Sequence, residues 1–298
     1  MNYKSFIYAA AVLTLGLTAC NKDEAAQTES FSADAVRINA TVGNGFAETR
    51  SNPVGTDEEQ AKFNAGDEIR VFARTSEKDP NPVTVIYKYD GKTWTPKDEK
   101  FITWKSDNMI FAAVYPAAEA EATIGDVTTD QSTLEKIAKC DWMTANISNA
   151  TKGQILNFAM QRITSRIVVN IAGFNPEFAA DAKVTDVKIV DQSDATPRIE
   201  SATTYTDYIP YPQGDGSTGS TYTLLIGRNM RYQYISLKVG NKEMHTAILN
   251  SSLNFENGNS YTFNLKVGKE KIEIESVTVA DWSNSVTIPG GSAGETII

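Results

Sequence analysis

Residues 17–20, Leu-Thr-Ala-Cys, close a short apolar run and are followed at once by polar and charged sequence. This pattern is typical of a bacterial lipoprotein signal peptide, in which the cysteine sulfur receives a lipid and the chain is cut just before it. The apolar run, Phe6 to Leu17, is shorter than the roughly 20 residues that a membrane-spanning helix needs. We therefore predict that residues 1–19 are a signal peptide and that Cys20 carries palmitate or a similar acyl chain.

The residues after Cys20 indicate where the chain is carried. Lys22-Asp23-Glu24 resembles the export tag of surface lipoproteins in some Gram-negative anaerobes, and it also fits a plain solvated tether. Up to Ala35 the chain is rich in Asp, Glu, Ala, Ser and Gln and has almost nothing to bury. We expect residues 20–35 to be a flexible tether and the protein to be an outer-membrane lipoprotein, exposed at the cell surface.

Few other residues have the types and spacing that catalysis needs. His245 is the sole histidine, which excludes clustered-histidine metal sites, and no GxSxG or similar nucleophile motif accompanies it. It alternates with Met244 and Thr246, as a half-exposed strand residue does. Asp191 and Asp194 are an acidic pair of the kind that a glycosidase uses, but such a pair needs a separation of about 5 to 10 Å that the sequence does not reveal.

Charge and composition exclude further classes of protein. The net charge is -9 at pH 7, and an acidic chain without a basic patch is a poor ligand for nucleic acid. No glycine-rich phosphate loop follows a predicted strand, so no nucleotide cofactor is expected. Cys140 is the one cysteine left after lipidation of Cys20, which leaves no intramolecular disulfide. We predict a protein that is not an enzyme and that needs no cofactor, metal or nucleic-acid partner.

Short alternating segments make up most of the remaining chain. Val36, Ile38, Ala40 and Val42 alternate with polar residues, which is the period of a half-buried strand. Turn residues such as Asp90-Gly91 separate the segments. The same alternation predicts strands over 67–73, 83–89, 109–115, 163–171, 184–190, 222–226, 234–239, 261–267 and 272–279.

The length of the chain predicts two domains. Roughly 260 mature residues exceed the size of one β-sandwich, so we expect an all-β protein of two tandem β-sandwiches, 36–155 and 156–298. The boundary near Leu156 follows a loop that contains Lys152-Gly153. One short helix is expected over Ser132 to Lys139, with Ser132 as its N-cap. The tryptophans are expected to fill the two cores: Trp94, Trp104, Trp142 and Trp282.

The order of the motifs along the chain resembles that of the fimbrillin family, the lipoprotein pilins of type V pili. The lipobox and the first amphipathic strand are followed by Thr49-Arg50 and by FNAGDEIRVF at 63–72. The second half contains FAMQRITSRIVV at 158–169, with Met160 where many relatives have histidine. Further motifs in the same order are YKYDG at 87–91 with Trp94, FAAVYP at 111–116, DWMTA at 141–145, GNSYTFNL at 258–265 and VTVADW at 277–282.

The resemblance implies transthyretin-like sandwich domains and assembly with other pilin subunits into a fimbria that supports adhesion. Similar pilins are exported as lipidated precursors and are cut by an arginine-specific protease after an early arginine. In this chain that implies cleavage between Arg50 and Ser51. Arg37 is disfavoured as the site because it lies inside the pattern of the first strand.

The cut implies that the first strand is lost. Without Val36, Ile38, Ala40 and Val42, a hydrophobic groove with unpaired backbone groups would open at the edge of the first sandwich. A donor strand from a neighbouring subunit restores both the backbone hydrogen bonds and the apolar filling.

The C-terminal end leaves the position in the fibre open. The candidate donor residues are Val286, Ile288, Ile297 and Ile298. Pro289-Gly290-Gly291 interrupts them, and proline and glycine weaken strand pairing. The chain is therefore either a stalk subunit or a tip or accessory subunit that accepts a strand without giving one.

A second hypothesis is a surface glycan-binding lipoprotein. Tyr205, Tyr208 and Tyr211 stand among prolines, and aromatic platforms bind sugars. The same arrangement is also typical of a packed loop. A receptor on a host or bacterial surface fits either hypothesis.

Overall fold

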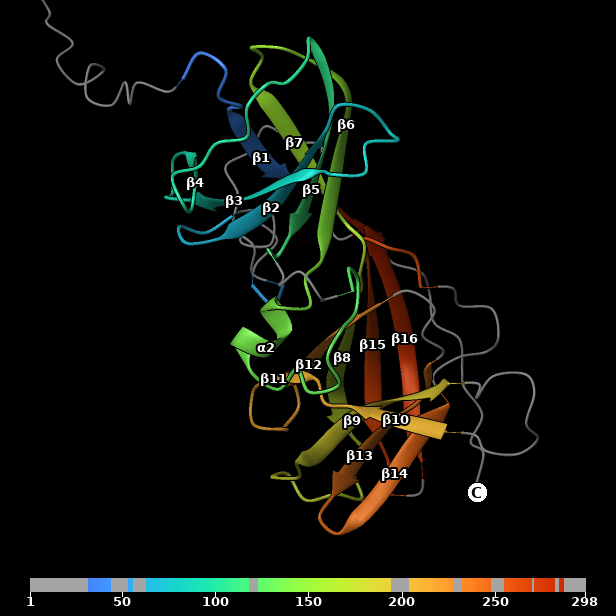
Figure 1. Ribbon diagram of the computed structural model, residues 1–298. Helices are drawn as coiled ribbons and strands as arrows, with labels where there is room; N and C mark the ends of the chain where they lie inside the picture. Colours follow the sequence, from blue (N-terminus) through green and yellow to red (C-terminus); the bar gives the residue numbers. More distant parts are fainter. Residues whose placement is uncertain are drawn as a thin grey trace, which may run out of the picture.

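The computed structural model describes residues 32–43, 53–55, 63–117, 123–193, 204–227, 232–247, 255–269, 271–281 and 284–286. Almost all regular structure in these ranges is β, in one sheet of seven strands, one of four and one of six. Strands β1 to β7 form one half of the molecule and the later strands form the other (Figure 1). The all-β prediction is thus confirmed. Within the described ranges no helix has the length and apolarity to cross a bilayer.

The first half is one sheet with the strand order β1-β7-β6-β5-β2-β3-β4. Its β1–β7 pair is parallel and its other pairs are antiparallel. The strands are β1 Ile38–Val42, β2 Glu68–Arg74, β3 Val83–Tyr89, β4 Trp94–Pro96, β5 Asn108–Tyr115, β6 Met143–Thr151 and β7 Leu156–Arg162.

This sheet curls around its own core. Strands β6 and β7 pair only at Met143↔Arg162 and Thr144↔Gln161, so β7 diverges from β6. The chain just before β1 forms a bridge to the segment after β4, through Ala35 and Thr103. The two ends of the strand order therefore meet, and the inward side chains share one cluster.

The inward side chains follow the alternation of the strands. Along β2, Ile69, Val71 and Ala73 are buried while their neighbours are more exposed. Trp94 and Trp104 belong to the same cluster, as expected. Trp142 is buried as well, and Trp282 lies outside the described residues.

The second half packs two sheets against each other, with the orders β10-β9-β13-β14 and β11-β12-β8-β15-β16-β17. Their common core includes Ile167, Val169 and Ile171, which alternate along β8. The strands are β8 Ser165–Phe174, β9 Val184–Ser193, β10 Thr204–Tyr208, β11 Tyr211–Gln213, β12 Thr221–Ile226, β13 Tyr232–Val239, β14 Lys242–Ala247, β15 Asn259–Val267, β16 Ile272–Asp281 and β17 Asn284–Val286.

The division between the halves differs from the expected boundary near Leu156. Strand β7, assigned above to the second domain, belongs to the first sheet, and its Leu156, Phe158 and Met160 lie in the first core. Gly153, with φ 89°, sits in a turn that joins two strands of one sheet and does not separate two domains. The chain changes sheets after Arg162, and β8 begins at Ser165.

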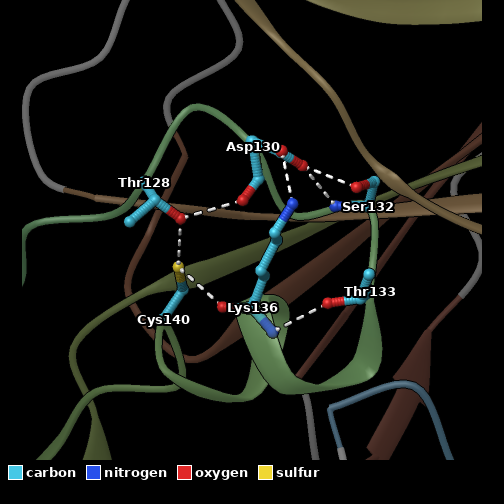
Figure 2. Close-up of polar contacts among 6 residues, drawn as sticks. All are labelled: Thr128, Asp130, Ser132, Thr133, Lys136 and Cys140. Atoms are coloured by element: carbon cyan, nitrogen blue, oxygen red, sulfur yellow. Dashed lines mark hydrogen bonds and ion pairs between the residues drawn. The ribbon is translucent and has the colours of Figure 1, made fainter.

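The short helix α2 Leu134–Ala138 lies where the two halves meet (Figure 1). Its N-cap is Thr133, whose Oγ1 accepts a hydrogen bond from the Lys136 backbone N–H at 3.3 Å. The expected cap, Ser132, instead donates its hydroxyl to the Asp130 carboxylate at 2.6 Å (Figure 2). The capping motif is present, one residue later than predicted.

Gln131 joins the two halves through its buried side chain. Its amide group donates to the Leu225 carbonyl at 2.7 Å, and its oxygen accepts from the Leu225 N–H at 2.8 Å. Strand β11 pairs with residues 221–223 of β12, so Gln131 supplies hydrogen bonds to β12 beyond the end of β11. Close by, Ile137, Cys140 and Leu225 form a small buried cluster, which we call the junction cluster.

Candidate functional site

The first strand fills part of the first core. The exposed fraction is 0% for Val36, 8% for Ile38 and 6% for Ala40, and the partly buried Val42 packs against the same cluster. The structure therefore brings together the four residues that the sequence singles out. Every second side chain points inward because β1 is extended, and the polar residues between them face outward.

On one side, β1 pairs with β7 in parallel register, with Ile38 opposite Leu156 and Val42 opposite Met160. The pairing continues beyond the strand ends, because the Leu156 N–H donates to the Arg37 carbonyl at 2.9 Å and the Gly43 N–H donates to the Met160 carbonyl at 2.7 Å. This side alone would leave β1 as an edge strand of the sheet.

On the other side, the chain that leads into β1 pairs with residues 102–104. The Val36 N–H donates to the Ile102 carbonyl at 2.8 Å, and the Trp104 N–H donates to the Asp34 carbonyl at 2.9 Å. An ion pair between the Lys152 ammonium and the Asp34 carboxylate, at 2.8 Å, lies at the surface. The first strand and its lead-in are thus held between β7 and the segment after β4.

Tyr87 of β3 reaches across the core to this lead-in. Its hydroxyl donates to the Val36 carbonyl at 3.1 Å. Burial raises the pKa of Tyr87 to about 12, so the hydroxyl keeps its proton and acts as a donor at neutral pH. The sequence predicts a strand over 83–89 but no role for Tyr87. The alternation of Tyr87 with Val83 and Val85 is the one sequence signal that its side chain faces inward.

This arrangement holds an extended segment, the chain's own first strand, along both of its sides. If β1 and its lead-in were absent, a slot lined by Tyr87, Phe158 and the other core side chains would lie open. Its two borders would present unpaired backbone groups, from β7 on one side and from Ile102 on the other. Such a slot accepts another strand through main-chain hydrogen bonds and alternate apolar side chains.

Several predicted site residues lie outside the described part of the chain. These are the lipidation residue Cys20, the cleavage residues Arg50 and Ser51, and the tail residues Ile288, Ile297 and Ile298.

The chain just after the predicted cut is described. The Pro53 carbonyl accepts from the Arg166 guanidinium at 3.2 Å, and the Val54 carbonyl accepts from the Gln213 side chain at 3.2 Å. The side chain of Val54 packs against the junction cluster. Residues 53–55 are therefore attached to the second half of the molecule, apart from β1.

Val286, the first residue of the expected donor tail, lies in β17. The backbone of β17 pairs antiparallel with β16, with Val286 opposite Val279. In this structure that part of the tail extends the six-stranded sheet of its own chain.

The three tyrosines of the glycan hypothesis do not form one platform. Tyr211 packs against the junction cluster and Tyr208 packs against the second core. Tyr205 is 49% exposed, and its ring lies 6.2 Å from that of Tyr234, which in turn lies 4.9 Å from the ring of His245. The aromatic row on this sheet is thus Tyr205, Tyr234 and His245. The glycan hypothesis named neither Tyr234 nor His245.

The histidine and the described aspartate of the acidic pair lie on different strands of one sheet, His245 on β14 and Asp191 on β9. Asp191 is buried, and Asp194 lies outside the described residues. His245 is half-exposed on β14, as its alternation with Met244 and Thr246 predicts. Its ring nitrogen Nε2 lies 3.9 Å from the Glu243 carboxylate. Among the described residues, no three His, Cys, Asp or Glu side chains are grouped closely enough to hold a metal ion.

Solved structures with the same fold include two from Bacteroides species. The chain is 18% identical to a candidate cell adhesion protein from Bacteroides uniformis, with a TM-score of 0.59 over 84% of this chain and 100% of that one. It is 12% identical to another from Bacteroides ovatus, with a TM-score of 0.57 over 84% of this chain and 96% of that one. These likenesses show the fold. No curated protein matches the chain.

A family model gives the relationship over nearly the whole sequence. The model described as fimbrillin-like matches residues 16–282. The match runs from Gly16 to Trp282 and includes the first strand and both halves of the molecule. The resemblance seen in the order of the sequence motifs is thereby confirmed, and the chain belongs to the fimbrillin-like family.

Proposed function

We propose that the protein is a pilus subunit that becomes competent for assembly when its first strand is removed. A donor strand from a neighbouring subunit then fills the vacated slot and links the two chains. The proposal rests on the burial of the first strand: Val36, Ile38 and Ala40 are core residues of the first half. Among the described residues, the backbone of this segment pairs only with β7 and with residues 102–104.

The proposed cut between Arg50 and Ser51 fits the contacts on either side of it. The described ladder of β1 reaches Gly43, and the next described residues, 53–55, contact the second half through Pro53. A cut between these two points frees the first strand and leaves residues 53–55 on the second half. Because β1 contributes several apolar side chains, its loss exposes core surface at a cost of about 0.8 kcal/mol per CH₂ group, which a donor strand recovers.

The other partners follow from this role. Before the cut, lipid on Cys20 holds the precursor at the outer membrane, and an arginine-specific protease then releases it into the fimbria. Replacing Cys20 by Ala should abolish labelling with radioactive palmitate; a mutant that still takes up label contradicts this anchor. The role in adhesion is structural and not enzymatic, with other pilin subunits as the direct partners.

The position in the fibre is proposed to be that of a tip or accessory subunit. A stalk subunit gives its own strand to the next one, whereas here β17 is paired within its own sheet and Pro289 follows it closely.

Side-by-side chromatography tests the assembly proposal. Protein starting at Asn21 should elute as a monomer, and the same protein nicked at Arg50 and freed of its first strand should dimerise, polymerise or aggregate. A synthetic peptide of residues 34–42, added in excess, should return it to the monomer. If the nicked protein stays monomeric, keeps its thermal stability and does not bind the peptide, strand exchange is not its function.

One observation favours glycan binding as a second candidate. The exposed Tyr205 continues a row of rings through Tyr234 to His245, and the Glu243 carboxylate lies 3.9 Å from the His245 ring nitrogen Nε2. Rings beside hydrogen-bonding groups suit a sugar. Binding to a glycan array that is lost in Tyr205→Ala supports this role, and an array without signal contradicts it.

A further inference from the structure

We propose that Tyr87 and the Ile102 peptide group form a clamp that grips the backbone of whichever strand occupies the slot beside β7. This clamp requires an occupant that extends at least two residues ahead of its pairing with β7. The inference rests on the proposed strand exchange and specifies the chemistry of the partner: an extended segment that has a peptide group, and not a proline nitrogen, at the clamp.

The geometry of the clamp differs from that of an ordinary strand pair. Residues Val36 and Ile102 face each other, and in a regular antiparallel pair such residues exchange two direct N–H···O=C bonds. Here the bond from Val36 N–H to the Ile102 carbonyl is direct, at 2.8 Å. In place of the return bond, the Val36 carbonyl accepts from the Tyr87 hydroxyl at 3.1 Å.

Burial makes these bonds matter. With the first strand in place, Val36, Tyr87 and Ile102 are each 0% exposed, so an occupant that covers the clamp shuts water out of it. When the first strand leaves, the hydroxyl loses its acceptor and the Ile102 carbonyl loses its donor. An occupant that covers these two groups without bonding to them leaves buried polar groups without partners, which is costly, so an occupant that restores both bonds is favoured.

The clamp binds the backbone of the occupant, and the rest of the slot contacts its side chains. The pockets opposite Leu156 to Met160 take alternating apolar side chains, which Ile38, Ala40 and Val42 provide in the precursor. A short strand can fill those pockets and still end before the clamp. Length and a free N–H at the position of Val36 therefore distinguish a good occupant from an apolar peptide that merely fits.

The test uses the protein from Asn21 onward, nicked at Arg50, so that all described residues remain present. Fluorescent peptides of residues 34–42 and 38–42 compete with the cut first strand. The acceptors are the unmodified protein, Tyr87→Phe, and Tyr115→Phe as the matched control. Tyr115 is buried in the same core, and its hydroxyl donates to the Asp67 carboxylate at 3.3 Å.

The unmodified acceptor should prefer the longer peptide. In Tyr87→Phe that preference should fall by about tenfold, while Tyr115→Phe should match the unmodified protein. A nine-residue peptide carrying Val36→Pro should bind the unmodified acceptor about tenfold more weakly than its parent. If Tyr87→Phe keeps the full preference, the clamp is wrong while strand exchange stands. If the unmodified acceptor takes up neither peptide, strand exchange itself fails and the clamp fails with it.

Discussion

The carboxylate of Asp141 and the guanidinium of Arg162 form a two-pronged ion pair at the junction of the halves, with Oδ1 to Nε at 2.9 Å and Oδ2 to Nη2 at 3.1 Å. Their side chains are 1% and 7% exposed. Asp141 follows helix α2, and Arg162 ends β7, immediately before the chain changes sheets. The pair thus fixes the point at which the first half ends.

Breaking this pair should destabilise the protein strongly, because one buried charge would remain without its partner. We expect Arg162→Ala to lower the free energy of unfolding by about 3 kcal/mol, measured by denaturant titration. Lys139→Ala removes an exposed ion pair with Glu135 on α2 and should change little. Equal effects of the two substitutions would contradict the structural role given to Asp141 and Arg162.

Gln131→Leu should also weaken the junction. The substitution keeps much of the side-chain volume but leaves the buried N–H and carbonyl of Leu225 without the partners they have now. We expect a loss of about 2 kcal/mol in the free energy of unfolding. Gln154→Leu, at an exposed turn position, is the control and should stay close to the unmodified protein. An unchanged free energy of unfolding in Gln131→Leu would show that β12 does not need this side chain.

Alkaline pH should weaken the hold on the first strand through Tyr87. The pKa of Tyr87 is raised from 10.0 to about 12 in the folded protein, so its stabilising effect is complete below pH 10 and is lost as the pH rises toward 12. Across this window the unmodified protein should lose about 2 kcal/mol more than Tyr87→Phe. The comparison is made by denaturant titration at pH 9 and 11.5, and parallel losses in both proteins would count against it.

Limited proteolysis should find the predicted maturation site. A low dose of a trypsin-like protease should cut the precursor between Arg50 and Ser51 first. Arg166 should resist because it lies in β8 and its guanidinium bonds to Ser260 and Pro53. N-terminal sequencing of the first product identifies the cut, and Arg50→Ala should lose it. A first cut elsewhere, or an unchanged cut in Arg50→Ala, would place maturation at another residue.

The strands with clear alternation were predictable, and their partners were not. Val36, Ile38 and Ala40 signal a strand by period alone, and the structure buries all three. Nothing in that period states that β1 would lie parallel to β7, since a parallel pair joins segments far apart in sequence. The misplaced boundary at Leu156 has the same origin, because a glycine turn between paired strands looks locally like a linker.

The polar contacts of the site were beyond the sequence for a different reason. Tyr87, Gln131 and the Asp141–Arg162 pair each act on a backbone or a side chain from a distant element. Local patterns describe which face a residue occupies, but they do not identify what lies opposite it. Removal of the first strand is implied by the family resemblance, whereas the residues that hold this strand are seen only in the structure.

The contacts of β1 also bear on the order in which the chain folds. Its side-chain bond to Asn157 spans 118 residues and the bond of its lead-in residue Val36 to Tyr87 spans 51, so the strand can dock only after long loops have closed. Strands β2 to β6 pair with nearer neighbours and can form earlier. Docking in this order would leave the slot beside β7 unfilled until β1 arrives. The covalent link keeps β1 at a high local concentration near this slot, which favours filling by the chain's own strand over filling by another chain.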